Sequence, residues 1–143
     1  MKIKKLSPSA TIPAQATDGS AGSDLCADLG EEDIHLLPGE TKLIHTGIAI
    51  ALDPKTVGLI FPRSGLATKR GLRLANSVAV IDSDYRGELL VALHNDSFKI
   101  QTILNGERIA QLVIVPYLNP EFEEVDELPS TDRGTGGFGS TGK

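Results

Sequence analysis

A chain of 143 residues, 40% of them hydrophobic, is long enough for one domain with a substantial apolar core. A formal net charge of −5 argues against general nucleic-acid binding, which needs a basic surface, and the single cysteine, Cys26, excludes an internal disulfide framework and favours a reducing compartment. Because no apolar run approaches membrane-spanning length and the N-terminus has no signal-peptide core, we expect a cytoplasmic protein without a membrane partner.

Short runs of strand-forming residues recur along the chain at intervals of about 8–12 residues, with turns between them. In chain order, the expected strands cover 1–6, 34–36, 41–52 (with a bend at Gly47), 57–61, 72–74, 78–81, 89–93, 98–103 and 107–115, and a last strand within 116–132 precedes a linker. The one convincing helix covers 64–70, with Ser64 as its N-cap and Gly71 at its end. This pattern predicts an all-β fold, most typically a jelly roll, whose sheet edges can be covered by oligomerisation.

The stretch 76–88, NSVAVIDSDYRGE, predicts a β-hairpin with functional side chains at its tip. The run 78–81 delivers Asp82 to a turn, Tyr85 starts the return, and the apolar run 89–93 follows. Loops held by a rigid sheet often carry catalytic residues. Considered alone, a surface turn whose aspartates bond their own backbone is the simpler interpretation.

Three other segments carry candidate ligand-binding groups. Arg63, Ser64 and Gly65 bring a guanidinium, a hydroxyl and helix N–H groups together, which suits phosphate, although an ordinary capped helix has the same residues. Asp24 is a candidate metal or water partner, but aspartate is common in turns. Gln111 lies in the apolar run IAQLVIV, either as a buried amide that needs a partner or as an outward-facing residue.

The C-terminal segment 133–143, RGTGGFGSTGK, cannot pack as a regular element. Its last seven residues spell G-x-x-x-x-G-K, but no strand leads in and no helix follows, so a nucleotide-switch P-loop is not predicted. Glycine-rich backbone still offers N–H groups to an anion, while Arg133 adds a charge and Phe138 a stacking surface. The alternative is a disordered tail, for which an isolated aromatic residue is unusual.

Together, five segments resemble the trimeric deoxyuridine triphosphate nucleotidohydrolases, the dUTPases. They are AGSDL at 21–25, PRSGLA at 62–67, NSVAVIDSDYRGE at 76–88, GERIAQLVI at 106–114 and RGTGGFGSTG at 133–142, in the family's order. The resemblance implies a jelly-roll (β-clip) homotrimer with active sites between subunits, which cleaves dUTP to dUMP and pyrophosphate with Mg²⁺. It also implies a core domain at 1–132 and a flexible lid at 133–143 that closes over the substrate.

The resemblance assigns a role to each candidate residue. Asp82 would hold and deprotonate the attacking water, Gln111 would orient water or phosphate, and Asp24 would help place Mg²⁺ through its water shell. Ligand binding would fall to the remaining positions: Tyr85 beneath the deoxyribose, Asn76, Val80 and Ile81 at uracil, Arg63, Ser64 and Gly65 on phosphate oxygens, Arg133 on the γ-phosphate, Phe138 stacked on the base and Gly139 through its backbone.

Two positions depart from the family pattern, and other functions remain open. Ser23 replaces an aromatic residue, and Ala79 replaces a glycine common beside the uracil pocket, which bears on base affinity. The related dCTP deaminases carry a catalytic glutamate where this chain has Ala92 and favour tryptophan at Tyr85, so deamination is not expected. A nucleotide-sensing protein and a structural jelly-roll module without a ligand are the remaining alternatives.

Overall fold

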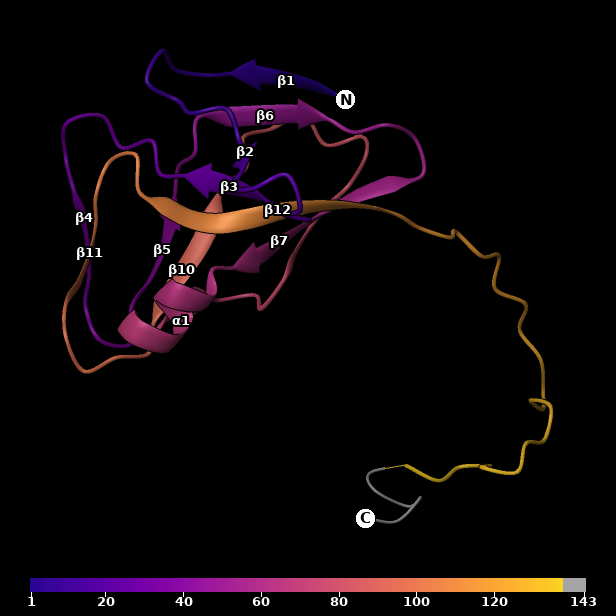
Figure 1. Cartoon of the computed structure of the whole chain (residues 1–143). Helices are drawn as coiled ribbons and strands as arrows, with labels where there is room; N and C mark the ends of the chain where they lie inside the picture. The colour runs from indigo at the N-terminus through magenta and orange to yellow at the C-terminus, as the bar shows by residue number, and fades with distance from the viewer. Residues whose placement is uncertain (138–143) are drawn as a thin grey trace.

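The computed structural model describes residues 1–137 and consists mostly of short strands with one helix (Figure 1). The elements are β1 (Lys2–Lys5), β2 (Ala14–Gln15), β3 (Ser23–Cys26), β4 (Ile34–Leu36), β5 (Thr41–Ile44), β6 (Ile48–Ala51), β7 (Thr56–Pro62), α1 (Ser64–Arg70), β8 (Leu72–Leu74), β9 (Ala79–Ile81), β10 (Val91–Asn95), β11 (Gln101–Ile103) and β12 (Arg108–Pro116). Within these residues, no helix is long and apolar enough to cross a bilayer.

All strand pairs are antiparallel and form four small sheets. The largest sheet has the order β2-β3-β12-β7-β9, and the others are β5-β10-β8, β1-β6 and β4-β11. Each sheet sends side chains into one aliphatic core, so the sheets enclose it as the walls of a jelly roll. The fully buried contributors include Leu25, Leu36, Ile44, Ile48, Ile60, Leu72, Leu93 and Ile103. The expected all-β jelly roll is therefore confirmed.

Gly47 divides the expected strand 41–52 into two strands of different sheets. β5 pairs with β10, whereas β6 pairs with β1. Gly47 has φ of +64°, which glycine adopts at little cost, and a Cβ there would collide with the Asp28 carboxylate and the Ala10 side chain. Gly47 is therefore not a bend within one strand: at this residue the chain passes from one sheet to another.

The predicted hairpin at 76–88 is wrong as a pair of hydrogen-bonded strands. β9 pairs with β7 at the edge of the five-stranded sheet, and β10 is the central strand of another sheet. Residues 82–90 therefore form a loop that crosses between two sheets. A local turn signal predicts where the chain reverses, but the core decides which strand it then joins.

One further expectation about strands is wrong, and one short strand was not predicted. The last strand expected within 116–132 is absent, because β12 itself runs to Pro116 and residues 117–137 contain no strand. Figure 1 shows this arm leaving the body after β12. The short strand β2 was not predicted, since two residues carry too little pattern to stand out.

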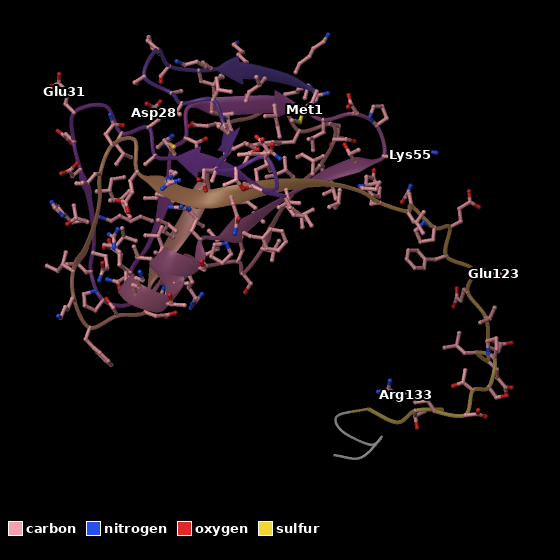
Figure 2. All side chains as sticks on the ribbon, in the orientation of Figure 1. Met1, Asp28, Glu31, Lys55, Glu123 and Arg133 are labelled. Carbon is pink, nitrogen blue, oxygen red and sulfur yellow. The ribbon has the colours of Figure 1, made fainter. Side chains whose placement is uncertain are left out.

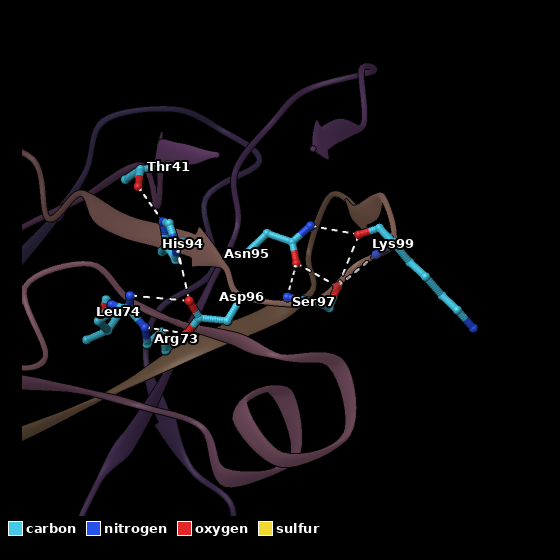
Figure 3. Close-up of polar contacts among 8 residues, drawn as sticks. All are labelled: Thr41, Arg73, Leu74, His94, Asn95, Asp96, Ser97 and Lys99. Atoms are coloured by element: carbon cyan, nitrogen blue, oxygen red, sulfur yellow. Dashed lines mark hydrogen bonds and ion pairs between the residues drawn. The ribbon is translucent and has the colours of Figure 1, made fainter. Parts of the chain in front are cut away.

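A polar network ties β8, β10 and the loop before β11 together (Figure 3). Asn95 is completely buried, and its side-chain amide donates to the carbonyls of Leu36 (2.9 Å) and Lys99 (2.8 Å). Its oxygen accepts from the backbone N–H and hydroxyl of Ser97. These bonds satisfy a buried amide that would otherwise be costly, so Asn95 fixes the turn after β10.

Candidate functional site

Most of the predicted site residues line one of two clefts. The first, called here the arginine cleft, is an open depression of about 620 Å³ where β3, β12, the end of β7 and α1 meet. It is lined by Ala16, Ser20, Ala21, Gly22, Asp24, Phe61, Arg63, Ser64, Gly65, Leu66, Lys69, Gln111 and Val113. The second, the tyrosine pocket, has about 190 Å³ and is lined by Val80, Ile81, Asp82, Tyr85, Glu88 and Leu90.

The junction between β7 and α1 presents the polar groups of the arginine cleft. β7 ends at Pro62, and Arg63 is the N-cap, with extended backbone (φ −84°, ψ 130°). The prediction that Ser64 caps the helix is wrong, because Ser64 is the first residue of the helix. The N-cap residue, Arg63, makes no capping hydrogen bond through its side chain. Ser64 and Gly65 are both exposed, so their groups face the cleft instead of closing the helix end.

Asp24, which lines the arginine cleft, bridges two arginines, of which Arg63 also lines the cleft and Arg108 does not. One carboxylate oxygen lies 3.0 Å from Nε of Arg63, and the other lies 3.1 Å from Nη1 of Arg108. Arg63 also donates to the Arg108 carbonyl at 3.2 Å. Two cationic residues, Arg63 and Lys69, line the cleft against the single carboxylate of Asp24, so the cleft suits an anion.

The sequence reasoning missed Arg108. Arg108 is half exposed and lies opposite Cys26 in the register of β12 and β3, at a bulge before Ala110. In the sequence, Arg108 stands beside Glu107 in GERIAQ and resembles part of an ordinary surface charge pair. Its contact with Asp24 arises only from the pairing of β12 with β3.

Gln111 occupies the centre of the arginine cleft on β12. Its register partners are Asp24 on β3 and Phe61 on β7, and its side-chain amide donates to the Pro62 carbonyl at 3.1 Å. The amide is only partly buried and it has a partner, so it does not carry the cost of an unpaired buried group. The side-chain oxygen lies beside Gly22, which also lines the cleft, and it has the capacity to accept a hydrogen bond from water or another donor there.

The tyrosine pocket is built from one continuous segment. Asp82 follows β9 directly, is exposed, and accepts the backbone N–H of Tyr85 through its carbonyl at 3.1 Å. The Tyr85 ring lies against Gly87, where any Cβ would collide with the phenol, and its hydroxyl donates to the Glu88 carbonyl at 3.0 Å. Glycine at 87 therefore lets the ring fold back and form the pocket wall.

Glu88 is a second residue that the sequence reasoning missed as part of the site. Its carboxylate accepts the backbone N–H groups of Thr46 (3.1 Å) and Gly47 (2.7 Å) and contacts Nδ1 of His45 at 2.8 Å. Burial alone would raise the pKa of Glu88, but the hydrogen bonds from His45, Gly47 and Thr46 outweigh burial and hold that pKa below its ordinary value.

The structure does not bring all predicted residues into one pocket of a single chain. The two clefts share no lining residue, so Asp82 and Tyr85 are separated from Arg63 and Gln111. Asn76 is exposed in the turn between β8 and β9 and lines neither cleft. Arg133 is exposed on the arm, far from the body in Figure 2. Phe138 and Gly139 lie outside the described residues.

Among residues 1–137, no group of three or more acidic, histidine or cysteine side chains is placed to hold a metal ion. Asp24, the predicted metal partner, is the one carboxylate of the arginine cleft, and both its oxygens contact arginines. This donor set does not form a closed protein cage. It fits an ion that is held mainly by the oxygens of a bound ligand and reaches Asp24 through water, as is common for Mg²⁺.

Comparison with known proteins gives one consistent result. The dUTPase family model matches residues 8–142. The deoxyuridine 5′-triphosphate nucleotidohydrolase of Hahella chejuensis is 53% identical over 140 residues, covering 97% of this chain and 91% of that protein.

Two solved structures extend the likeness to the fold. A mutant of Staphylococcus bacteriophage 80alpha dUTPase with dUpNHpp matches with a TM-score of 0.86 and 30% identity, covering 99% of this chain and 98% of the other. A mutant of the dUTPase from phage phi11 of S. aureus, described as revealing the coordination of a structural Mg(II) ion, has a TM-score of 0.78 and 28% identity, with 88% and 96% covered. Because the family model covers most of the chain and a relative of 53% identity covers 97% of it, this chain belongs to the dUTPase family.

Proposed function

We propose that this protein is a dUTP diphosphatase, which hydrolyses dUTP to dUMP and pyrophosphate. The observation that carries the proposal is the arginine cleft, where Asp24, Arg63, Ser64 and Gln111 converge from separate parts of the chain. Family membership gives the substrate, and the cleft supplies the cations and donors that a triphosphate needs. Such an activity would supply dUMP and keep uracil out of DNA.

In the proposed reaction, Asp82 takes a proton from a water molecule that attacks the α-phosphorus. Carboxylates are ionised near neutral pH and can act as general bases when they reach the water. Arg63, Ser64 and Gly65 hold phosphate oxygens, and Gln111 orients the water or a phosphate oxygen. Phosphoryl transfer depends mainly on charge stabilisation and alignment, which these groups provide without a covalent intermediate.

The tyrosine pocket selects the nucleoside. Tyr85 packs beneath the deoxyribose, where its ring leaves no room for a 2′-hydroxyl. The backbone of Val80 and Ile81 reads uracil together with Asn76, which would reach the base from outside the pocket, and the narrow space excludes a thymine methyl. Support comes from the small volume of the pocket and from the close fit of the Tyr85 ring against Gly87.

We infer that the active site is shared between subunits of a homotrimer. The two clefts of one chain share no lining residue, so the base end and the phosphate end of one nucleotide would be bound by different copies. Mixing two inactive variants, Asp82→Asn and Arg63→Ala, tests this arrangement. Trimers assembled from both should recover activity at about a quarter of their sites in a random mixture. No recovery in trimers verified by sedimentation would place each site within one chain.

Mg²⁺, carried by the phosphate oxygens of the substrate, would neutralise part of their charge. Asp24 would contact it through water, because its own oxygens already bond Arg63 and Arg108. Addition of EDTA should lower hydrolysis, and excess Mg²⁺ should restore it. Equal rates with and without EDTA would remove the ion from the proposal.

The segment 133–143 is proposed as a lid that closes over bound substrate, with Arg133 on the γ-phosphate, Phe138 stacked on the base and Gly139 contacting the ligand through its backbone. Truncation after Asp132 should preserve assembly but lower kcat/KM for dUTP strongly. If the truncated protein keeps the full kcat/KM, the tail has no catalytic role.

A pyrophosphate-release panel with dUTP, dTTP, dCTP and UTP tests the proposed function as a whole. Only dUTP should be cleaved rapidly. Ammonia release from dCTP would favour the deaminase alternative, and dUTP binding without cleavage would favour a nucleotide sensor. An intracellular location stays a prediction, which the unpaired Cys26 supports.

A further inference from the structure

We propose that Glu88 is a positioning residue for sugar selection, acting by fixing Tyr85 to the bend between β5 and β6. The inference rests on the proposed function, in which Tyr85 excludes the 2′-hydroxyl. Glu88 lines the tyrosine pocket, and its side chain also bonds a separate part of the fold, the bend at Thr46 and Gly47. Among the described residues that line this pocket, no other side chain makes such a bond.

The first step is the link from Glu88 to the bend. One oxygen accepts both backbone N–H groups of the bend, from Thr46 and Gly47, and the other contacts Nδ1 of His45. The Glu88 side chain is only 21% exposed, so these contacts are shielded from competition by water. A carboxylate that accepts several N–H bonds holds its neighbours more firmly than a neutral acceptor would.

The second step is the rigidity of the bend itself. Its backbone is held by bonds from Leu6 to the Gly47 carbonyl (2.7 Å) and from Asp28 to the His45 carbonyl (2.8 Å). On the other side, the Leu89 N–H donates to the Ile48 carbonyl at 2.8 Å. The completely buried Leu89 follows Glu88 directly, so the anchor lies next to the core.

The third step is the link from Glu88 to Tyr85. The Tyr85 hydroxyl donates to the backbone carbonyl of Glu88 at 3.0 Å, and the ring lies on Gly87 between them. The position of the ring therefore depends on where the Glu88 backbone is held. Release of the Glu88 side chain would leave this end of the turn held to the bend only by the Leu89–Ile48 bond, so the Glu88 carbonyl that accepts the Tyr85 hydroxyl would be free to shift.

The side-chain chemistry separates three substitutions. Glu88→Ala removes the acceptor and leaves two backbone N–H groups without partners. Glu88→Asp keeps the charge but is one methylene shorter, so it cannot hold both the bend and the Tyr85 turn in their present positions. Glu88→Gln retains one oxygen for Thr46 and Gly47, while its NH₂ group can face His45.

The test measures kcat and KM for dUTP and UTP separately in the wild-type protein and these variants. Glu88→Ala and Glu88→Asp should lower the dUTP/UTP ratio of kcat/KM by about tenfold, mainly because kcat/KM for UTP rises relative to that for dUTP. Glu88→Gln should keep most of the wild-type ratio. If Glu88→Ala does not fold, Glu88→Asp decides the question.

Glu40→Ala is the matched control. Glu40 also accepts a backbone N–H through its side chain, from Leu37 at 2.8 Å, and pairs with Lys42, but it lines neither cleft. A wild-type dUTP/UTP ratio is therefore expected in this control. Unchanged discrimination in a folded Glu88→Asp protein, or the same loss in Glu40→Ala, would overturn the role of Glu88. Failure of the wild-type protein to hydrolyse dUTP would instead contradict the proposed function.

Discussion

The arginine cleft and the tyrosine pocket are built in opposite ways. Charged and polar side chains converge on the arginine cleft from several segments, where Asp24 pairs with Arg63 and Gln111 bonds the Pro62 carbonyl. The tyrosine pocket comes from the single stretch 80–90, and backbone hydrogen bonds give it its shape. Under the proposed function, the charge of the arginine cleft would supply affinity for any triphosphate, and the shape of the tyrosine pocket would select the nucleoside.

The largest expected effect comes from Asp82→Asn, which removes the proposed base without changing its size. Turnover of dUTP should fall by about 10²–10⁴-fold, while binding of dUTP is retained, because the amide cannot take a proton from water. Proton release in a stopped-flow assay gives the rate, and calorimetry gives the affinity. A near-normal rate of dUTP turnover in Asp82→Asn would mean that the tyrosine pocket binds the nucleotide but supplies no catalytic base.

A smaller loss is expected from Arg63→Lys in the arginine cleft. Lysine keeps the charge but loses the planar fork, so kcat/KM should fall about a hundredfold. If this cleft is indifferent to the nucleoside, the loss should be the same for dUTP and UTP. A selective loss with one of the two nucleotides would contradict the division between charge and shape.

Tyr85→Ala, in contrast to Arg63→Lys, is expected to change the choice between dUTP and UTP more than the binding of phosphate. Removal of the ring should admit UTP and lower the dUTP/UTP ratio about tenfold, with little change in phosphate affinity. Inhibition by pyrophosphate provides the control for the phosphate end, since it needs no sugar contact. Unchanged sugar discrimination would move this role to another residue.

The smallest effect concerns stability against acid. The folded protein keeps Glu88 ionised below its unfolded-state pKa of 4.5, so the unfolded chain binds more protons in that range and stability falls as pH falls below 4.5. Above that pH the stabilisation is fully present. Glu88→Gln should show a weaker pH dependence of thermal unfolding than the wild-type protein. Identical slopes would mean that Glu88 adds no pH-linked stability to the tyrosine pocket.

Local features of the fold could be predicted from the sequence because they depend on neighbouring residues. The strand at 34–36, the helix at 64–70 and its end at Gly71 follow from side-chain pattern and turn chemistry. The pair Asn105-Gly106, which is typical of a tight turn, lies between the strands expected at 98–103 and 107–115. A turn forms there with Gly106 at φ +75°, although β11 and β12 join different sheets. Pairing between distant strands depends on the whole core, so the hairpin at 76–88 was predicted wrongly.

The same limit applies to the site. Asp82 and Tyr85 could be identified from one segment, but the roles of Arg108 and Glu88 depend on contacts with residues far away in the chain. Arg108 reaches Asp24 only because β12 pairs with β3, and Glu88 reaches Gly47 only because the chain changes sheets at that bend. Spacing along the sequence contains no signal for either contact.

The arm that begins after β12 would set the distance over which the proposed lid at 133–143 acts. Its start is fixed where the Tyr117 N–H donates to the Lys55 carbonyl at 3.1 Å, and Leu118, Phe122 and Leu128 are almost fully exposed along it. From Pro116 to Arg133, extended chain spans roughly 55 Å. The prolines and acidic residues of this arm favour extension over a compact coil. Tethering at this range gives an attached group a local concentration of about the millimolar scale. Arg133 would then approach a nucleotide by search within a small volume, and shortening the arm would slow that capture without altering either cleft.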